Sequence, residues 1–272
     1  MKKTLLALLV LSGCASTTST PVVEDNTPKE EQYIPASVHV ELGVPKDSDS
    51  TDDYMIKRPQ YWLSYNPQLN VANWVSWNEN ADWYGDEPRC DCFTKDPLLP
   101  SEFASVTTSD YTNSGYSRGH VLGSEARTKT AEDNRTTFYM SNIIPQTSEL
   151  NSGTYNTFER FRDSLCKQAN KELYVIAGGV YITKNKIKDK ITIPDSCYMI
   201  VVVLDKGKKL KDVSNTTTIY AAMMHNGKYT KDNNDWRLYK RSVDDIERTT
   251  GYDFLSGISE AIEKSIESKV AR

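Results

Sequence analysis

The chain has 272 residues, of which 38% are hydrophobic, and it contains 16 tyrosines and 5 tryptophans. This apolar content is enough for a buried core in one large or two small domains, and it excludes a wholly disordered chain. The formal charge of −4 argues against a protein with a broad basic surface for nucleic acid, but not against an enzyme, which needs only a local positive cleft.

The N-terminus is typical of an export signal. Lys2 and Lys3 precede a short apolar run, and Leu11-Ser12-Gly13-Cys14 resembles a bacterial lipobox. We therefore predict a lipoprotein-type signal peptide over residues 1–13, lipidation of Cys14, and a protein anchored by lipid to the membrane of the cell envelope, in the periplasm or on the cell surface. An ordinary signal peptide, which would release a secreted protein, is the alternative.

Residues 14–53 are rich in Ser, Thr, Pro, Asp and Glu and show little apolar periodicity, so we predict a flexible tether before a folded domain at 54–272. His39 lies in a short alternating stretch within that tether. The pattern favours a fragment of strand with a solvent-exposed histidine.

Four further cysteines follow: Cys90, Cys92, Cys166 and Cys197. An even number in an exported protein predicts two disulfides, for which three pairings exist. A Cys90–Cys92 bond would close a very tight ring, so we favour bonds from both residues to distant partners. A zinc site is disfavoured because the C-x-C spacing lacks a second cysteine pair of the usual kind.

The remaining chain alternates between strand and helix patterns. The aromatic segment 54–86 is either core or a base-stacking platform, and core is the commoner use. We predict strands at 69–78, 116–121, 136–144, 173–181, 198–204 and 219–224, and helices at 153–170, 244–250 and 254–269. This order predicts an α+β domain with a mixed, mostly antiparallel central sheet and helices packed on it.

The stretch from Ser117 to Glu159 contains the residue types that phosphodiester hydrolysis needs. The imidazole of His120 can take a proton from water, and the planar fork of Arg118 suits phosphate oxygens. The carbonyl of Asn151 is a hard ligand for Mg²⁺, and Glu159 lies about two helical turns further on. Together they indicate a metal-dependent phosphodiesterase site.

The order and spacing of short motifs in this stretch resemble the DNA/RNA non-specific endonuclease family, which includes endonuclease G. The motifs are Tyr116-Ser117-Arg118-Gly119-His120, then TFYMSNIIPQ at 137–146, then Leu150-Asn151-Ser152-Gly153 with Glu159. The resemblance covers about residues 54–255. It implies a ββα-metal active site and cleavage of DNA and RNA that leaves 5′-phosphate ends.

The resemblance also implies a role for each residue. His120 is the general base, and Asn151 is the ligand of Mg²⁺, or of Mn²⁺ in its place. Glu159 holds metal-bound water. Arg118 and Asn142 support the site and the phosphate, and Arg89 binds phosphate.

Ser117 departs from the family pattern, because it stands where the family usually has aspartate. A serine hydroxyl can still form hydrogen bonds but brings no charge. This departure, with the acidic composition, favours one alternative: a catalytically impaired nuclease-fold lipoprotein that acts as a nucleic-acid or surface binding module.

Overall fold

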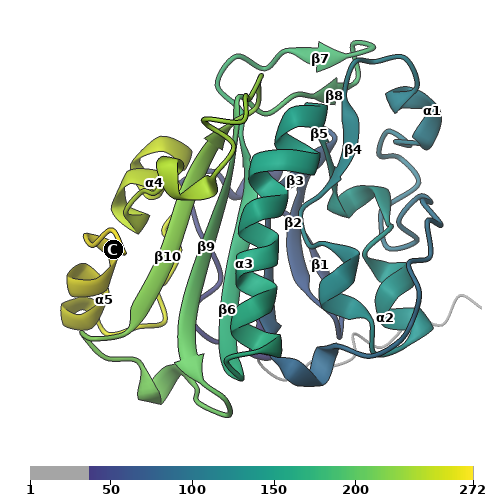
Figure 1. Ribbon diagram of the computed structural model, residues 1–272. Coiled ribbons are helices and arrows are strands. Elements are labelled where there is room, and N and C mark those ends of the chain that lie inside the picture. The colour runs from purple at the N-terminus through teal and green to yellow at the C-terminus, as the bar shows by residue number, and fades with distance from the viewer. Residues whose placement is uncertain (1–36, 272) are drawn as a thin grey trace, which may run out of the picture. The chain divides into compact units, whose positions relative to one another are not determined.

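The structure is a computed structural model that describes residues 37–271. Its centre is a six-stranded antiparallel sheet in the order β1-β2-β3-β6-β9-β10 (Figure 1). The strands are β1 Tyr54–Lys57, β2 Trp62–Asn66, β3 Val71–Glu79, β6 Lys171–Val180, β9 Ser196–Asp205 and β10 Thr218–His225. Four of the strands predicted from the sequence therefore exist within one to three residues of their expected bounds, those at 69–78, 173–181, 198–204 and 219–224.

Both faces of this sheet are buried. In β9, Cys197, Met199 and Val201 belong to one hydrophobic cluster, whereas Tyr198 and Ile200 belong to another on the opposite face. Successive side chains of a strand point to opposite faces, so a strand that is covered on both sides needs an uninterrupted apolar run.

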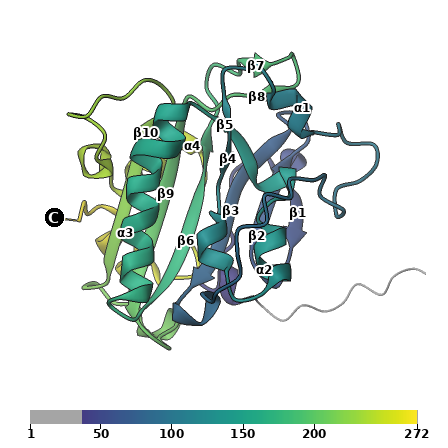
Figure 2. The same ribbon diagram turned by 45° about the vertical axis from the view of Figure 1, so that its right-hand side comes forward.

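The first face is covered by helix α3, Tyr155–Lys167, and by a hairpin of β4, Ser117–His120, with β5, Ile143–Gln146. Figure 2 shows β4 and β5 in front of the β2–β3 side of the sheet, and α3 in front of the β9–β10 side. Helix α2, Ala131–Thr136, lies between β4 and β5 in the sequence. The predicted strand at 116–121 and the predicted helix after Gly153 are both present.

The second face is covered by α4, Val243–Thr250, and α5, Glu260–Glu267, through Val243, Ile246 and Ile266. Two short elements lie outside the main layers: helix α1, Thr108–Tyr111, and a hairpin of β7, Lys186–Ile187, with β8, Ile191–Thr192. The mixed, mostly antiparallel architecture that we predicted is confirmed. No helix in residues 37–271 is long and apolar enough to cross a bilayer.

The predicted strand at 136–144 is wrong in its first part. Residue 136 ends α2, Met140–Asn142 form a 3₁₀ turn, and strand β5 begins only at Ile143. Before it, Tyr139 forms a single parallel bridge with Thr94. The buried Asn142 amide binds the backbone carbonyls of Leu122 and Thr137 and holds the chain in a turn there. Tertiary hydrogen bonds thus override the strand propensity of this segment. The helix predicted at 254–269 is also shorter, because only α5 is helical.

Part of the predicted tether belongs to the folded domain. Residues 38–40 form a 3₁₀ turn, not a strand, and Leu42 is buried against the second face of the sheet. His39 is buried rather than solvated: Nε2 contacts the Pro59 carbonyl at 2.6 Å, and Nδ1 accepts from the Asn78 N–H at 3.0 Å. The predicted signal peptide, Cys14 and the remainder of the tether lie outside the described residues.

The predicted disulfides are wrong. Cys90 bonds Cys92 across a Cα–Cα distance of 5.1 Å, because Asp91 between them adopts a left-handed conformation with φ of 49°. Cys166, on α3, and Cys197, on β9, are buried free thiols.

Candidate active site

His120 ends β4 and is 9% exposed. Its ring lies against Phe93 and Phe138, with centroid distances of 5.4 and 4.8 Å. Burial, reinforced by the positive charge of Arg89, lowers the pKa of His120 to about 3, so the imidazole is neutral at pH 7. Within residues 37–271 its Nε2 has no hydrogen-bond partner. Nε2 is also shielded from solvent, so the ring nitrogen that a group in the pocket can reach is Nδ1.

Asn142 is a positioning residue, not a ligand of phosphate. It is fully buried, its Oδ1 accepts from the Leu122 N–H at 3.0 Å, and its Nδ2 donates to the Leu122 and Thr137 carbonyls. Its backbone carbonyl accepts from the Val121 N–H at 2.9 Å. Both N–H donors of the side chain are used within the protein, so none is left for a substrate. The side chain instead holds the turn that follows His120.

Two glycines on either side of His120 allow close packing. A Cβ on Gly119 would lie 2.2 Å from Oε1 of Gln146, so this position makes room for a β5 side chain and not for substrate. A Cβ on Gly123 would lie 2.5 Å from Oε1 of Glu159. The absence of a side chain at Gly123 therefore lets the Glu159 carboxylate reach the loop that follows His120.

Asn151 and Glu159 lie on one continuous helical segment. Leu150–Thr154 is a π-helical turn that leads directly into α3, so the helical segment begins three residues before the predicted start at residue 153. π-turns are rare and are often found at functional sites. Within the described part of the chain, Asn151 forms a backbone hydrogen bond to Thr147 at 2.9 Å and its side-chain amide forms none. Its carbonyl oxygen is thus free for a ligand.

The carboxyl group of Glu159 is largely surrounded by protein. Burial raises the pKa of Glu159 to about 7, and the nearby Arg162 partly offsets this increase. Glu159 is the only carboxylate among the residues that we predicted for the site.

These side chains meet in one pocket. It is lined by Arg89, Arg118, His120, Gly123, Ser124, Glu125, Asn151, Ser152, Asn156, Glu159, Arg160, Arg162 and Asp163. Five of the six site residues predicted from the sequence are thus brought together, and Asn142 lies behind them. The Arg118 guanidinium stacks 4.3 Å over the ring of Phe93, and Arg89 donates to Ser124 Oγ at 2.9 Å.

Ser117 lies in an adjoining pocket that Arg89, Arg118 and Asn151 also line. The same pocket contains Asp91, which pairs with Arg89 at 2.7 Å. Asp91, which belongs to the disulfide-closed loop, thus brings a carboxylate into the same pocket as Ser117.

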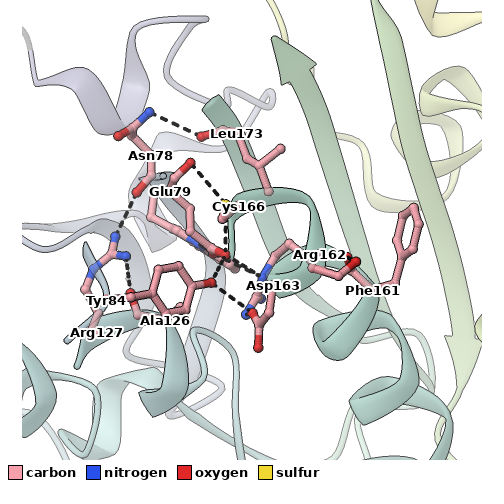
Figure 3. Close-up of polar contacts among 12 residues, drawn as sticks. Asn78, Glu79, Tyr84, Ala126, Arg127, Phe161, Arg162, Asp163, Cys166 and Leu173 are labelled. Carbon is pink, nitrogen blue, oxygen red and sulfur yellow. Dashed lines mark hydrogen bonds and ion pairs between the residues drawn. The ribbon is translucent and has the colours of Figure 1, made fainter. Parts of the chain in front are cut away.

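Sequence reasoning missed an ionic network that includes two of the lining residues, Arg162 and Asp163. Arg162 on α3 binds Glu79 of β3 at 3.0 Å and Asp163 at 2.9 Å, and Tyr84 donates to Glu79 at 2.6 Å (Figure 3). Arg162 is completely buried, and in residues 37–271 its Nη1 has no partner. One feature of the sequence could have indicated this network: Arg162 places a charge on the apolar face of the predicted helix, four residues after Phe158.

The donor set fits a divalent metal ion. A free amide carbonyl from Asn151 and the carboxylate of Glu159 are hard oxygen donors, which Mg²⁺ and similar ions prefer. The neutral imidazole of His120 lines the same pocket, and its Nδ1, which is not enclosed as Nε2 is, remains free for proton transfer.

Comparison with known proteins identifies the family. Residues 41–261 match the model of the DNA/RNA non-specific endonuclease family. A nuclease of Nostoc sp. is 43% identical over 98% of this chain and 95% of its own length. Nuclease C1 of Cunninghamella echinulata is 28% identical over 77% of this chain and 85% of its own length, and mitochondrial nuclease EXOG of Xenopus laevis is 27% identical over 79% and 61%.

The fold resembles one solved in a complex of EndoG with EndoGI, with a TM-score of 0.70 over 83% of this chain and 94% of that one, at 22% identity. That likeness concerns the fold alone. The family match and the Nostoc relative, which extend over nearly the whole folded domain, show that the chain belongs to the DNA/RNA non-specific endonuclease family and is a nuclease.

Proposed function

We propose that the protein is an exported, Mg²⁺-dependent endonuclease that hydrolyses phosphodiester bonds of DNA and RNA, with His120 as general base and Asn151 as metal ligand. The observation that supports this most directly is the neutral imidazole of His120 in a pocket that also contains Arg89, Arg118 and the free carbonyl of Asn151. Each component of a phosphodiesterase site is then present in one cavity.

In the proposed mechanism, Nδ1 of His120 takes a proton from water as the water oxygen attacks phosphorus. Arg89 and Arg118 bind the phosphoryl oxygens and compensate their charge. The bond from phosphorus to the 3′ oxygen breaks, and that oxygen takes a proton from solvent water, which leaves a 5′-phosphate and a 3′-hydroxyl. Bound Mg²⁺ supplies Lewis-acid stabilisation of charge on the phosphoryl and leaving oxygens, and Asn151 and Glu159 are the residues that would hold and orient it.

Low sequence preference follows from this arrangement. The proposed substrate contacts are made by guanidinium groups with phosphate, and such contacts carry no base information. Both DNA and RNA are therefore expected as substrates.

Export rests on residues 1–14. We propose cleavage before Cys14 and a lipid anchor on that cysteine, which would keep a non-selective nuclease away from the cell's own nucleic acid. Labelled palmitate should be incorporated into the wild type and not into a Cys14→Ser variant; equal labelling of both would contradict the anchor.

The second candidate is the impaired binding module, which Ser117 favours. The carboxylate of Asp91 in the adjoining pocket weakens that argument, since it supplies a negative charge near the same place. The two candidates can be distinguished because the endonuclease cleaves nucleic acid, whereas the binding module binds without cleaving it.

The decisive assay uses plasmid DNA and structured RNA with the purified protein, in Mg²⁺ and in chelator. The wild type should cleave both substrates only with metal. His120→Ala should lose about 10²–10⁴-fold in rate, because the proton acceptor is removed, and should keep its circular dichroism spectrum. Wild-type cleavage by that variant would refute the assignment of the base, and inactivity of the wild type would favour the binding module.

Asn151→Ala tests the metal ligand. The variant should need a much higher Mg²⁺ concentration for half-maximal rate, because a direct oxygen donor is lost. Asn156→Ala is the matched control: it removes another pocket amide from the same helix and should leave the Mg²⁺ titration unchanged. Identical titration curves for the two variants would point to a different ligand.

A further inference from the structure

A second group of carboxylates lies between α4 and α5, on the sheet face opposite the nuclease site. One carboxylate oxygen from each of Asp244, Glu247 and Glu267 lies within 4.8 Å of the others. Asp244 and Glu247 share one face of α4 at i, i+3 spacing, and Glu267 is the last residue of α5. None of the three forms an ion pair with any lysine or arginine in residues 37–271.

Among the three carboxylates, Glu267 gives the strongest indication of a bound ion. It is only 5% exposed, and in the described chain its Oε1 has no hydrogen-bond partner. Oε1 of Glu263, one helical turn earlier on α5, is likewise buried without a partner among these residues. Buried charged groups are normally paired or coordinate a metal, so an unpaired carboxylate directed at two others must be neutralised, either by a bound cation or by a proton.

Neither α4 nor α5 supplies a positively charged side chain that would neutralise these carboxylates. Like charges at i, i+3 and i, i+4 on a helix repel each other, and a carboxylate at the C-terminus of α5 meets the negative end of the helix dipole. The nearby cations are engaged elsewhere: Lys264 pairs with Glu260 at 2.6 Å, and Arg248 pairs with Asp245.

We propose that Asp244, Glu247 and Glu267 bind a Ca²⁺ ion that joins α4 to α5. Ca²⁺ takes six to eight oxygen ligands at about 2.3–2.6 Å, so two ligands of one ion can lie up to roughly 5 Å apart. The observed separations fall within that limit. Mg²⁺ is less suitable because it demands near-ideal octahedral geometry at about 2.0–2.1 Å and keeps several waters.

The consequence is structural rather than catalytic. Ile246 on α4 and Ile266 on α5 pack into the same cluster of the second sheet face, next to the acidic residues. An ion at this place would hold both helices on the sheet, far from the residues that line the nuclease pocket. The proposal is therefore independent of the proposed nuclease mechanism.

The test measures Ca²⁺ binding by calorimetry and the melting temperature, Tm, in Ca²⁺ and in chelator. Asn151→Ala serves as the parent protein, so that binding in the nuclease pocket does not confuse the result. At 100-fold excess over Kd, Ca²⁺ should raise Tm by roughly 5 °C. Adding Glu267→Gln should abolish that rise and also raise Tm in chelator, because repulsion among the carboxylates is relieved.

Glu260→Gln is the matched control, since it removes the same charge from the exposed face of the same helix. It should retain the full rise in Tm with Ca²⁺. Absence of Ca²⁺ binding in the parent, or an equal rise in the Glu267→Gln variant, would overturn the proposal. A larger rise with Mg²⁺ than with Ca²⁺ would overturn the choice of ion. A stability that depends on pH but not on Ca²⁺ would show that a proton neutralises the cluster instead.

Discussion

Two glycines shape the nuclease pocket because they have no side chain. Gly123 has no side chain, and this allows the Glu159 carboxylate to approach the loop after His120. Gly119 similarly admits Gln146 beside β4. The positions of the reactive groups thus depend on close contacts that any Cβ would displace.

Gly123→Ala should lower the nuclease rate without unfolding the protein. The added methyl would lie 2.5 Å from Oε1 of Glu159, and the carboxylate must move away. A displacement of about 1 Å in an active site can cost up to roughly 10²-fold in rate. The measurement is kcat on plasmid DNA together with a thermal melt.

Gly227→Ala is the control for that variant. Its added Cβ would lie 2.3 Å from Nε2 of the exposed His225, which lies outside the pocket and can turn away. Its rate should remain close to wild type. Equal rates for both glycine variants would show that the placement of Glu159 does not limit turnover.

At the scale of elements, the 3₁₀ turn at 38–40 is attached to β3 by a single histidine. His39 contacts the Pro59 carbonyl through Nε2 and accepts the Asn78 N–H at Nδ1, so the ring is held in one neutral tautomer. A protonated ring would direct a second N–H at the N–H of Asn78. The contact therefore requires an uncharged histidine.

Stability should consequently fall in mild acid. Burial, followed by the charge of Arg127, lowers the pKa of His39 from 6.5 to about 3, so the unfolded state binds more protons between these values. The contribution is complete above pH 6.5 and is lost as the pH falls towards 3. At pH 5 the loss should be about 2 kcal/mol, measured as the difference in free energy of unfolding in urea at pH 7 and pH 5.

His39→Asn should remove this share of the pH dependence, although it also lowers stability at pH 7 because the contact with Pro59 is lost. His225→Asn is the control, since His225 is exposed at the end of β10. If the His39 and His225 variants keep the same pH slope, another group is responsible.

At the scale of the whole molecule, the central sheet separates two structural regions. One face bears the nuclease pocket and α3, and the other bears α4, α5 and the N-terminal turn. The Glu79–Arg162–Asp163 network connects β3 of the sheet to α3 (Figure 3). It thereby attaches the helix that carries Glu159 to the sheet.

Arg162→Met should destabilise the domain by about 3–5 kcal/mol, because it leaves the buried Glu79 carboxylate without its cation. Chemical denaturation measures the loss. Adding Glu79→Gln should restore most of it, since the unpaired charge is then removed as well.

The neighbouring Arg160→Met substitution is the control. Arg160 is exposed on the same helix, and its loss should change stability by no more than about 0.5 kcal/mol. Similar losses from both arginine variants would mean that the effect is not specific to the buried pair.

Much of the fold could be predicted from local patterns. Residues 198–204 are uninterruptedly apolar, which a strand covered on both faces requires, and Tyr155, Phe158 and Leu165 recur at the spacing of a helix. The segment 136–144 was mistaken for a strand because its β-branched and aromatic residues pack equally well in buried turns.

By itself, the sequence determined the class of fold, the family and the residue types of the site, because these depend on periodicity and on the order of motifs along the chain. Only the tertiary structure decided that Asn142 supports the chain instead of facing substrate, that Cys90 pairs with Cys92, and that His39 is buried. It also brought together Glu79 with Arg162, and Glu267 with Asp244. Each of these depends on groups distant in sequence or on one backbone angle, and neither residue type nor local spacing specifies such contacts.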